Sequence, residues 1–199
     1  MPTRVILIRH GETDWNLERR YCSFTGVDLN NKGIMQAEKL FYKLRKEKID
    51  KVYSSDSPRA LNFARILFKE APIEKVYELR EINFGIFEGL RHEEIMERHP
   101  EVYKRWLDDP FLVALPEGDN LGDFKKRVEN ALARIISVNE DKVAAVVTHA
   151  GPIKIIIRNI LKSKDIWAIK PDLASLSIVD FTDDKGKVKL FNDTRSLNG

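Results

Sequence analysis

Short apolar runs alternate with longer stretches of helical periodicity along the chain. Val5–Arg9, Lys51–Ser54 and Val143–His149 are rich in β-branched residues and predict strands. The last run is almost continuously apolar, which is typical of a strand covered on both faces. Lys32–Lys48 and Asp123–Val138 repeat apolar residues at helical spacing and predict helices with one buried face.

This alternation predicts an α/β fold, a three-layer α/β/α sandwich around a mainly parallel sheet. Ala174–Phe181 and Val188–Phe191, separated by TDDKGK, predict a closing hairpin. Residues 84–122 contain several glycines and prolines and are expected to be the least regular part, a lid over the sheet edge. With 199 residues and no linker, residues 1–199 are expected to form one domain.

Composition and charge narrow the class of protein. No stretch approaches the roughly 18 apolar residues that a membrane span requires, and no signal peptide precedes the first strand. The single cysteine, Cys22, excludes an internal disulfide and suits a reducing compartment, so we expect a cytoplasmic protein. The net charge is +3, and both signs are interleaved even in KLRKEKIDK. Neither a nucleic acid nor a membrane is therefore expected as a partner.

Polar side chains follow two of the predicted strands. Arg9 and His10 end the first strand and precede Gly11, whereas His149 ends another and precedes Ala150 and a further glycine. Ligands of open α/β sheets bind beyond the carboxyl ends of the strands. Small residues there let backbone amides approach a ligand. These residues therefore predict a binding site at one edge of the sheet.

The stretch VYSSDSPRA adds a third strand end. Ser57 is expected to cap the following helix, Pro58 suits its first position, and Arg59 falls in its first turn. Helix N-termini attract anions through free N–H groups and the helix dipole. Two arginines and two histidines at three strand ends predict a phosphate pocket.

The residue types suit transfer of a phosphoryl group. Guanidinium groups neutralise phosphoryl oxygens, one neutral imidazole can attack phosphorus, and the other can donate a hydrogen bond. The leaving group needs a proton, and Glu81 in LREINFGIFEG is the candidate acid, expected where a strand gives way to a turn. A phosphate dianion beside this carboxyl would raise its pKa, and its carboxylate could later activate water.

The blocks LIRHGETDWN, SSDSPRA, LREINFGIFEG and VVTHAGP occur in this order, and with LNNKGIMQA they resemble the histidine phosphatase superfamily over nearly the whole chain. The resemblance implies that His10 is the phosphorylated nucleophile and Glu81 the proton donor. It implies that Arg9, Arg59 and His149 bind the phosphate and that Asn16 is a further donor. It also implies that no metal or other cofactor is needed and that the substrate is a small phosphorylated metabolite.

Two differences from the mutases of this superfamily indicate which branch the chain resembles. Cys22 and Ser23 stand where the mutases carry Thr-Gly, so these two residues are expected at an altered substrate mouth, together with Ala150. About thirty residues separate Gly89 from LPEGDN, too few for the basic segment that closes over bisphosphoglycerate in cofactor-dependent mutases. An open site admits water, which favours a phosphatase. A phosphoglycerate mutase and a non-catalytic phosphate-binding regulator are the alternatives.

Other residues have ordinary explanations. His92 and His99 lie in a charged helical stretch, and Glu88 is expected to be structural. A thiol phosphatase based on Cys22 would need an arginine at position 28, which is Asp28. An exposed edge strand near residues 174–181 could pair across a two-fold axis, which makes a homodimer an open alternative.

Overall fold

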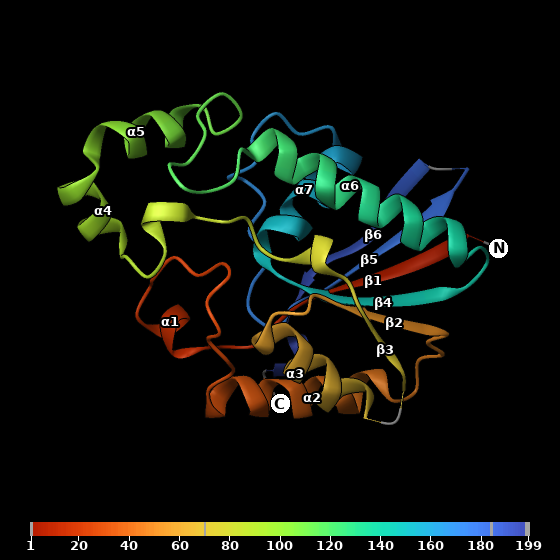
Figure 1. Cartoon of the computed structure of the whole chain (residues 1–199). Coiled ribbons are helices and arrows are strands. Elements are labelled where there is room, and N and C mark those ends of the chain that lie inside the picture. The colour runs from red at the N-terminus through yellow and green to blue at the C-terminus, as the bar shows by residue number, and fades with distance from the viewer. Residues whose placement is uncertain (1, 70, 184, 198–199) are drawn as a thin grey trace.

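A six-stranded sheet forms the centre of the computed structural model, which describes residues 2–69, 71–183 and 185–197 (Figure 1). The strand order is β3-β2-β4-β1-β5-β6. The pairs β1–β4, β2–β4 and β2–β3 are parallel, whereas β5 runs antiparallel to both β1 and β6. The mainly parallel sheet that the sequence predicts is therefore confirmed. The strands are β1 (Thr3–Arg9), β2 (Lys51–Ser54), β3 (Ile73–Lys75), β4 (Val143–Thr148), β5 (Leu176–Thr182) and β6 (Lys185–Asp193).

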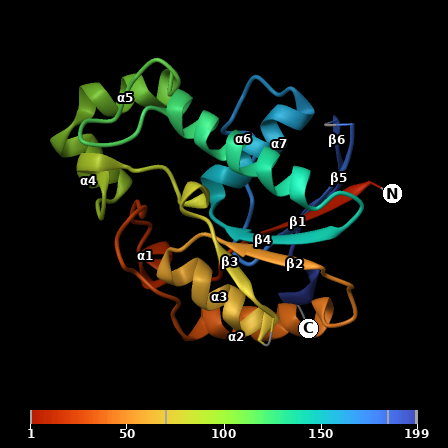
Figure 2. The same ribbon diagram turned by 45° about the vertical axis from the view of Figure 1, so that its right-hand side comes forward.

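Helices cover both faces of the sheet (Figures 1 and 2). On one face, α6 and α7 pack with the sheet around a core that includes Leu7, Val146 and Phe124. On the other face, α2 and α3 pack around Ile8 and Phe63. The helices are α1 (Asp14–Leu17), α2 (Asn31–Leu44), α3 (Pro58–Phe68), α4 (His92–Arg98), α5 (Pro100–Asp108), α6 (Leu121–Val138) and α7 (Ala150–Leu161). These three layers are the predicted sandwich.

The carboxyl ends of three parallel strands lie side by side. Arg9 of β1 pairs with Thr148 of β4, and Ser54 of β2 pairs with Val147 of β4. The chain continues this register beyond the strands, because the His10 amide donates to the Thr148 carbonyl at 3.0 Å. The residues that follow these strands are consequently held at one edge of the sheet.

The 84–122 segment is more regular than the sequence analysis expects. It contains α4 and α5, which lie apart from the layers of the sheet, on the side to which β1 points (Figure 1). These helices have a hydrophobic core of their own, built around Phe87, Tyr103 and Trp106. The glycines and prolines of the segment lie mainly at element boundaries, where they do not prevent helix formation. Pro100, for example, occupies the first turn of α5.

Three smaller expectations are wrong. Ser57 precedes α3, but its side chain makes no capping hydrogen bond with the helix. The helix α2 ends at Leu44, earlier than the predicted Lys48. The strand β5 is not at the edge of the sheet, because β6 pairs with it along its outer side. The basis for a homodimer through residues 174–181 is therefore removed.

Within the described ranges, no helix is both long enough and apolar enough to cross a membrane.

Phe63 links the core to the loop that follows β1. Its side chain is fully buried, and a Cβ at Gly11 would lie 2.7 Å from its ring. We expect Phe63→Ala to lower the free energy of unfolding by about 3–5 kcal/mol, because the cavity cannot close completely. Met35→Ala, at a half-exposed position of α2, should change it by about 0.5 kcal/mol or less. Urea denaturation of both variants measures the difference, and equal effects would contradict this packing role.

Candidate active site

His10 presents one ring nitrogen as a hydrogen-bond acceptor. Its Nδ1 lies 2.7 Å from the Gly11 carbonyl oxygen, which can only accept a hydrogen bond. In the neutral ring Nδ1 therefore carries the proton and Nε2 carries the lone pair. The Arg59 Nε donates to this Nε2 over 3.3 Å. The ring is almost fully buried, and its nucleophilic nitrogen is fixed in direction.

Arg59 lies in the first turn of α3 and is 1% exposed. Its Nη2 donates to the Ser23 carbonyl at 2.9 Å. The carboxylate of Glu88 in turn accepts hydrogen bonds from the amide and the hydroxyl of Ser23. Glu88 therefore holds the loop that orients Arg59, as its expected structural role requires.

His149 is the residue immediately before α7, and its ring is fully buried beside His10. The two ring centroids are 5.1 Å apart. His149 Nε2 lies 2.9 Å from the hydroxyl of Ser55. Ser55 is the first residue beyond β2. The three strand ends are thus joined through side chains as well as through the sheet.

Three buried donors around His10 have no acceptor among the residues that the structure describes. They are Nε of Arg9, Nη1 of Arg59 and Nδ1 of His149, the last in the tautomer that accepts from Ser55. The rest of the Arg9 guanidinium is anchored, because Nη1 donates to the Pro171 carbonyl at 2.8 Å. Most buried polar groups in folded proteins are satisfied, since an unpaired one costs about 1–3 kcal/mol. Three unpaired donors in one place fit a site for an anion.

Both imidazoles are kept neutral by their surroundings. Burial lowers the pKa of His10 well below its ordinary value, and the charges of Arg59 and Arg9 lower it further. The pKa of His149 is lowered for the same reasons, burial first and then Arg59. Burial also lowers the pKa of Arg9, but a guanidinium remains charged in proteins. The site therefore combines two cations with two neutral imidazoles.

Glu81 lies at the rim of this arrangement and is 7% exposed. Its two oxygens accept from the amides of Ile82 and Gly151, each at 3.0 Å. A Cβ at Gly151 would collide with this carboxylate, so a larger residue there would displace the Glu81 side chain. The preceding strand does not reach Glu81 as expected: β3 ends at Lys75, and a 3-10 turn (Tyr77–Leu79) lies between. The adjacent Arg80 pairs with an aspartate, Asp56, at 2.6 Å.

A pocket of about 270 Å³ opens at this edge of the sheet. Seven of the predicted site residues line it, namely Arg9, His10, Asn16, Cys22, Arg59, Glu81 and Ala150. Asn16 Oδ1 accepts from Thr13, which leaves the Nδ2 amide group available to a ligand. Within the described ranges, no group of three His, Cys, Asp or Glu side chains could hold a metal ion.

Cys22 and Ser23 differ in their placement. Cys22 lines the pocket, but burial raises the pKa of its thiol to about 11, which disfavours the thiolate. The Ser23 side chain is fully buried and donates to Glu88, so its expected place at the substrate mouth is wrong. Its contribution is the carbonyl that holds Arg59.

Several residues of the site are missing from the sequence analysis, among them the pocket-lining Arg19, Arg20, Tyr21 and Phe84. Ser55 contacts His149, and the serines of SSDSPRA are the signal that could have indicated it. Arg127 of α6 donates to the carbonyls of Glu78 and Glu81, at 2.9 and 3.2 Å, and so fixes the backbone that carries the Glu81 carboxylate. An arginine within a predicted amphipathic helix gives no such signal.

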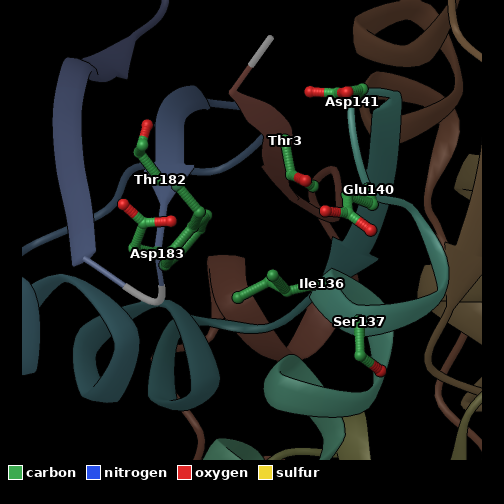
Figure 3. A pocket seen from close by; sticks show the side chains of 8 residues that line it. Thr3, Ile136, Ser137, Glu140, Asp141, Thr182 and Asp183 are labelled. Carbon is green, nitrogen blue, oxygen red and sulfur yellow. The ribbon is translucent and has the colours of Figure 1, made fainter.

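A second hollow, of about 470 Å³, lies at the opposite end of the sheet. Figure 3 shows Thr182 and Asp183 on one side of it and Thr3 and Glu140 on the other. Thr3 begins β1, whereas the predicted site follows the end of that strand. The acidic side chains here disfavour an anion, and none of the predicted site residues lines this hollow.

Known proteins share both the sequence pattern and the fold. The family model described as histidine phosphatase superfamily (branch 1) matches residues 5–194. The bifunctional protein Rv2228c of Mycobacterium tuberculosis is 36% identical over 202 residues, which cover 98% of this chain and 55% of that protein. The chain thus spans about half the length of this curated relative.

Two further comparisons cover nearly the full length of both proteins. Phosphoserine phosphatase 1 of Hydrogenobacter thermophilus is 29% identical over 198 residues, covering 98% of this chain and 94% of the relative. The crystal structure of the α-ribazole phosphatase from Shigella flexneri superposes with a TM-score of 0.87 at 28% identity, covering 96% of each chain.

The lowered pKa values of both histidines predict a loss of stability in mild acid. Below about pH 6.5 the unfolded chain binds protons at His10 and His149 that the folded chain does not bind. The free energy of unfolding should therefore fall as the pH is lowered from 6.5 to 5.5, by up to about 1.4 kcal/mol per pH unit for each histidine. Urea denaturation across this range measures the slope. His149→Gln should reduce it, and an unchanged slope would contradict a neutral His149.

Proposed function

Because the chain belongs to the histidine phosphatase superfamily, we propose that it is a phosphatase that hydrolyses a small phosphomonoester through a phosphohistidine on His10. The observation that supports this most strongly is the set of three unpaired donors, from Arg9, Arg59 and His149, beside the lone pair of His10 Nε2. A phosphoryl group would supply the acceptors that these donors lack. Its phosphorus would then face the nucleophilic nitrogen.

In the first step, the Nε2 lone pair of His10 attacks phosphorus and the bond from phosphorus to the ester oxygen breaks. Glu81, as the carboxylic acid, gives its proton to the departing oxygen. The guanidinium groups of Arg9 and Arg59 neutralise the charge on the phosphoryl oxygens. The Ser55 hydroxyl donates to Nε2 of His149, so that Nδ1 carries the proton. This N–H group then donates a hydrogen bond to a phosphoryl oxygen.

In the second step, water attacks the phosphohistidine. The Glu81 carboxylate removes a proton from this water, and the bond between nitrogen and phosphorus breaks. Inorganic phosphate leaves, and the lone pair of His10 Nε2 is restored. The same carboxyl group thus acts first as an acid and then as a base.

The substrate is proposed to be a small phosphorylated metabolite. Phosphoserine and α-ribazole phosphate are candidates because relatives of similar length carry those names. We also propose that the reaction needs no metal or other cofactor, since its charge stabilisation comes from arginine side chains. A reducing cytoplasmic setting is proposed from the lone thiol of Cys22, which has no disulfide partner.

Hydrolysis of p-nitrophenyl phosphate in the presence of EDTA tests this proposal. We expect phosphate release that EDTA does not reduce, and a loss of at least about 10³-fold in His10→Ala, which lacks the nucleophile. His99→Gln, a histidine outside the pocket, should retain activity. Loss of turnover with EDTA, or full activity of His10→Ala, would reject the mechanism. Exchange between phosphoglycerate isomers without free phosphate would instead indicate a mutase.

Glu81→Gln tests the acid. It should lower kcat for an alkyl phosphate by about 10²-fold or more, because a poor leaving group needs the proton. With p-nitrophenyl phosphate the rate of phosphohistidine formation should change much less, since p-nitrophenolate leaves readily. Rapid-quench measurement of the first turnover with both substrates gives the comparison. An equal loss with the two leaving groups would assign Glu81 a role other than proton donation.

A further inference from the structure

A small cavity of about 100 Å³ adjoins the phosphate pocket. The two share Glu81, Phe84 and Ala150 in their walls, so they are immediate neighbours. The remaining wall comes from α5, α6, α7 and two loops, with the residues Ile82, Trp106, Leu121, Phe124, Gly151, Lys154, Ile166 and Trp167. This wall is almost entirely apolar.

Lys154 is the exception to this apolar wall. It lies on α7 four residues after Ala150, so both side chains lie on the same face of the helix, one turn apart. Its Nζ lies 5.1 Å from the centre of the Trp167 ring. Within the part of the chain that the structure describes, this ammonium has neither a hydrogen bond nor a carboxylate within 4.0 Å, although the charge of Glu81 acts on it from farther away. Burial lowers its pKa, and a bound anion would oppose that effect.

Trp106 supplies a second donor without an acceptor. The side chain is 3% exposed, and its Nε1–H is buried with no hydrogen-bond partner among the described residues. A buried indole N–H ordinarily has a partner, because an unpaired donor is destabilising. The neighbouring carboxylate of Glu81 is not its partner, and the two oxygens of that carboxylate accept from backbone amides.

We propose that Lys154 and Trp106 form a second subsite, which binds a carboxylate at the far end of a short apolar leaving group. This inference rests on the proposed phosphatase function, because it identifies what the phosphoryl group is attached to. A carboxylate supplies acceptors to both donors and neutralises the lysine. The volume limits what enters this cavity, since it is smaller than an engineered cavity of about 150 Å³ that binds benzene. A carboxylate on a short alkyl spacer fits it, whereas the ring of an aromatic leaving group would have to stay in the larger phosphate pocket.

Matched substrates test the subsite. The series contains ω-phosphonooxy carboxylates of three to five carbons and the ω-hydroxyalkyl phosphates of the same lengths. We expect the wild type to favour at least one carboxylate over its neutral partner by about tenfold or more in kcat/KM. Lys154→Met and Trp106→Phe, which keep the apolar volume, should each lower this preference several-fold and leave the neutral substrate unaffected.

Two further variants act as controls. Lys154→Arg keeps the charge and should retain the preference, whereas Lys170→Met removes an exposed lysine nearby and should not alter it. Equal losses for charged and neutral substrates in Lys154→Met would show that the lysine acts on catalysis and would overturn the subsite. The absence of any preference in the wild type would also overturn it.

Binding to the His10→Ala protein separates the subsite from catalysis. Calorimetric titration of the same substrate pairs into this variant requires no turnover. The carboxylate should bind about tenfold more tightly than its neutral partner, and adding Lys154→Met should remove the difference. A preference in binding without turnover in the wild type would reject the phosphatase and retain the subsite. Turnover of neutral substrates without a binding preference would retain the phosphatase and reject the subsite.

Discussion

The site depends on the burial of three hydrogen-bond donors whose acceptor is not part of the described chain. Arg9, Arg59 and His149 each leave one polar N–H group unpaired among the described residues, and all three side chains lie close to His10. Each unpaired donor costs about 1–3 kcal/mol, so a substantial part of the stability of a domain of this size is stored at one point. An oxyanion relieves that cost. The arrangement is therefore organised for its ligand before the ligand binds.

Three kinds of contact hold these donors in place. The parallel register of β1, β2 and β4 brings the strand ends to one edge, and the segments that follow carry the functional side chains. Backbone carbonyls of Gly11, Pro171 and Ser23 then orient His10, Arg9 and Arg59. More distant groups, Glu88 and Arg127, fix the loops that supply those contacts and the acid. The core beneath them is ordinary apolar packing.

Much of this arrangement is predictable from the sequence, because local patterns control it. The apolar runs place the strands that end at Arg9, Ser54 and Thr148 correctly, and the polar residues after them mark the site. Within 84–122 the helical stretch around His92 is predicted, but α5 is not, and the segment is expected to be irregular because its apolar residues pack against one another and not against the sheet. Ser23 and Arg127 are misjudged or missed for a related reason. Their roles come from contacts with residues distant in the chain, such as Glu88 and Glu81, which no local pattern specifies.

The most direct test is a crystal structure of the protein with bound inorganic phosphate or orthovanadate. The anion is predicted to lie against His10 Nε2, with Nε of Arg9, Nη1 of Arg59 and Nδ1 of His149 each within hydrogen-bond distance, about 2.7–3.2 Å, of one of its oxygens. All three unpaired donors would then be satisfied by one ligand. An anion bound elsewhere, with these donors still unpaired, would contradict the central claim.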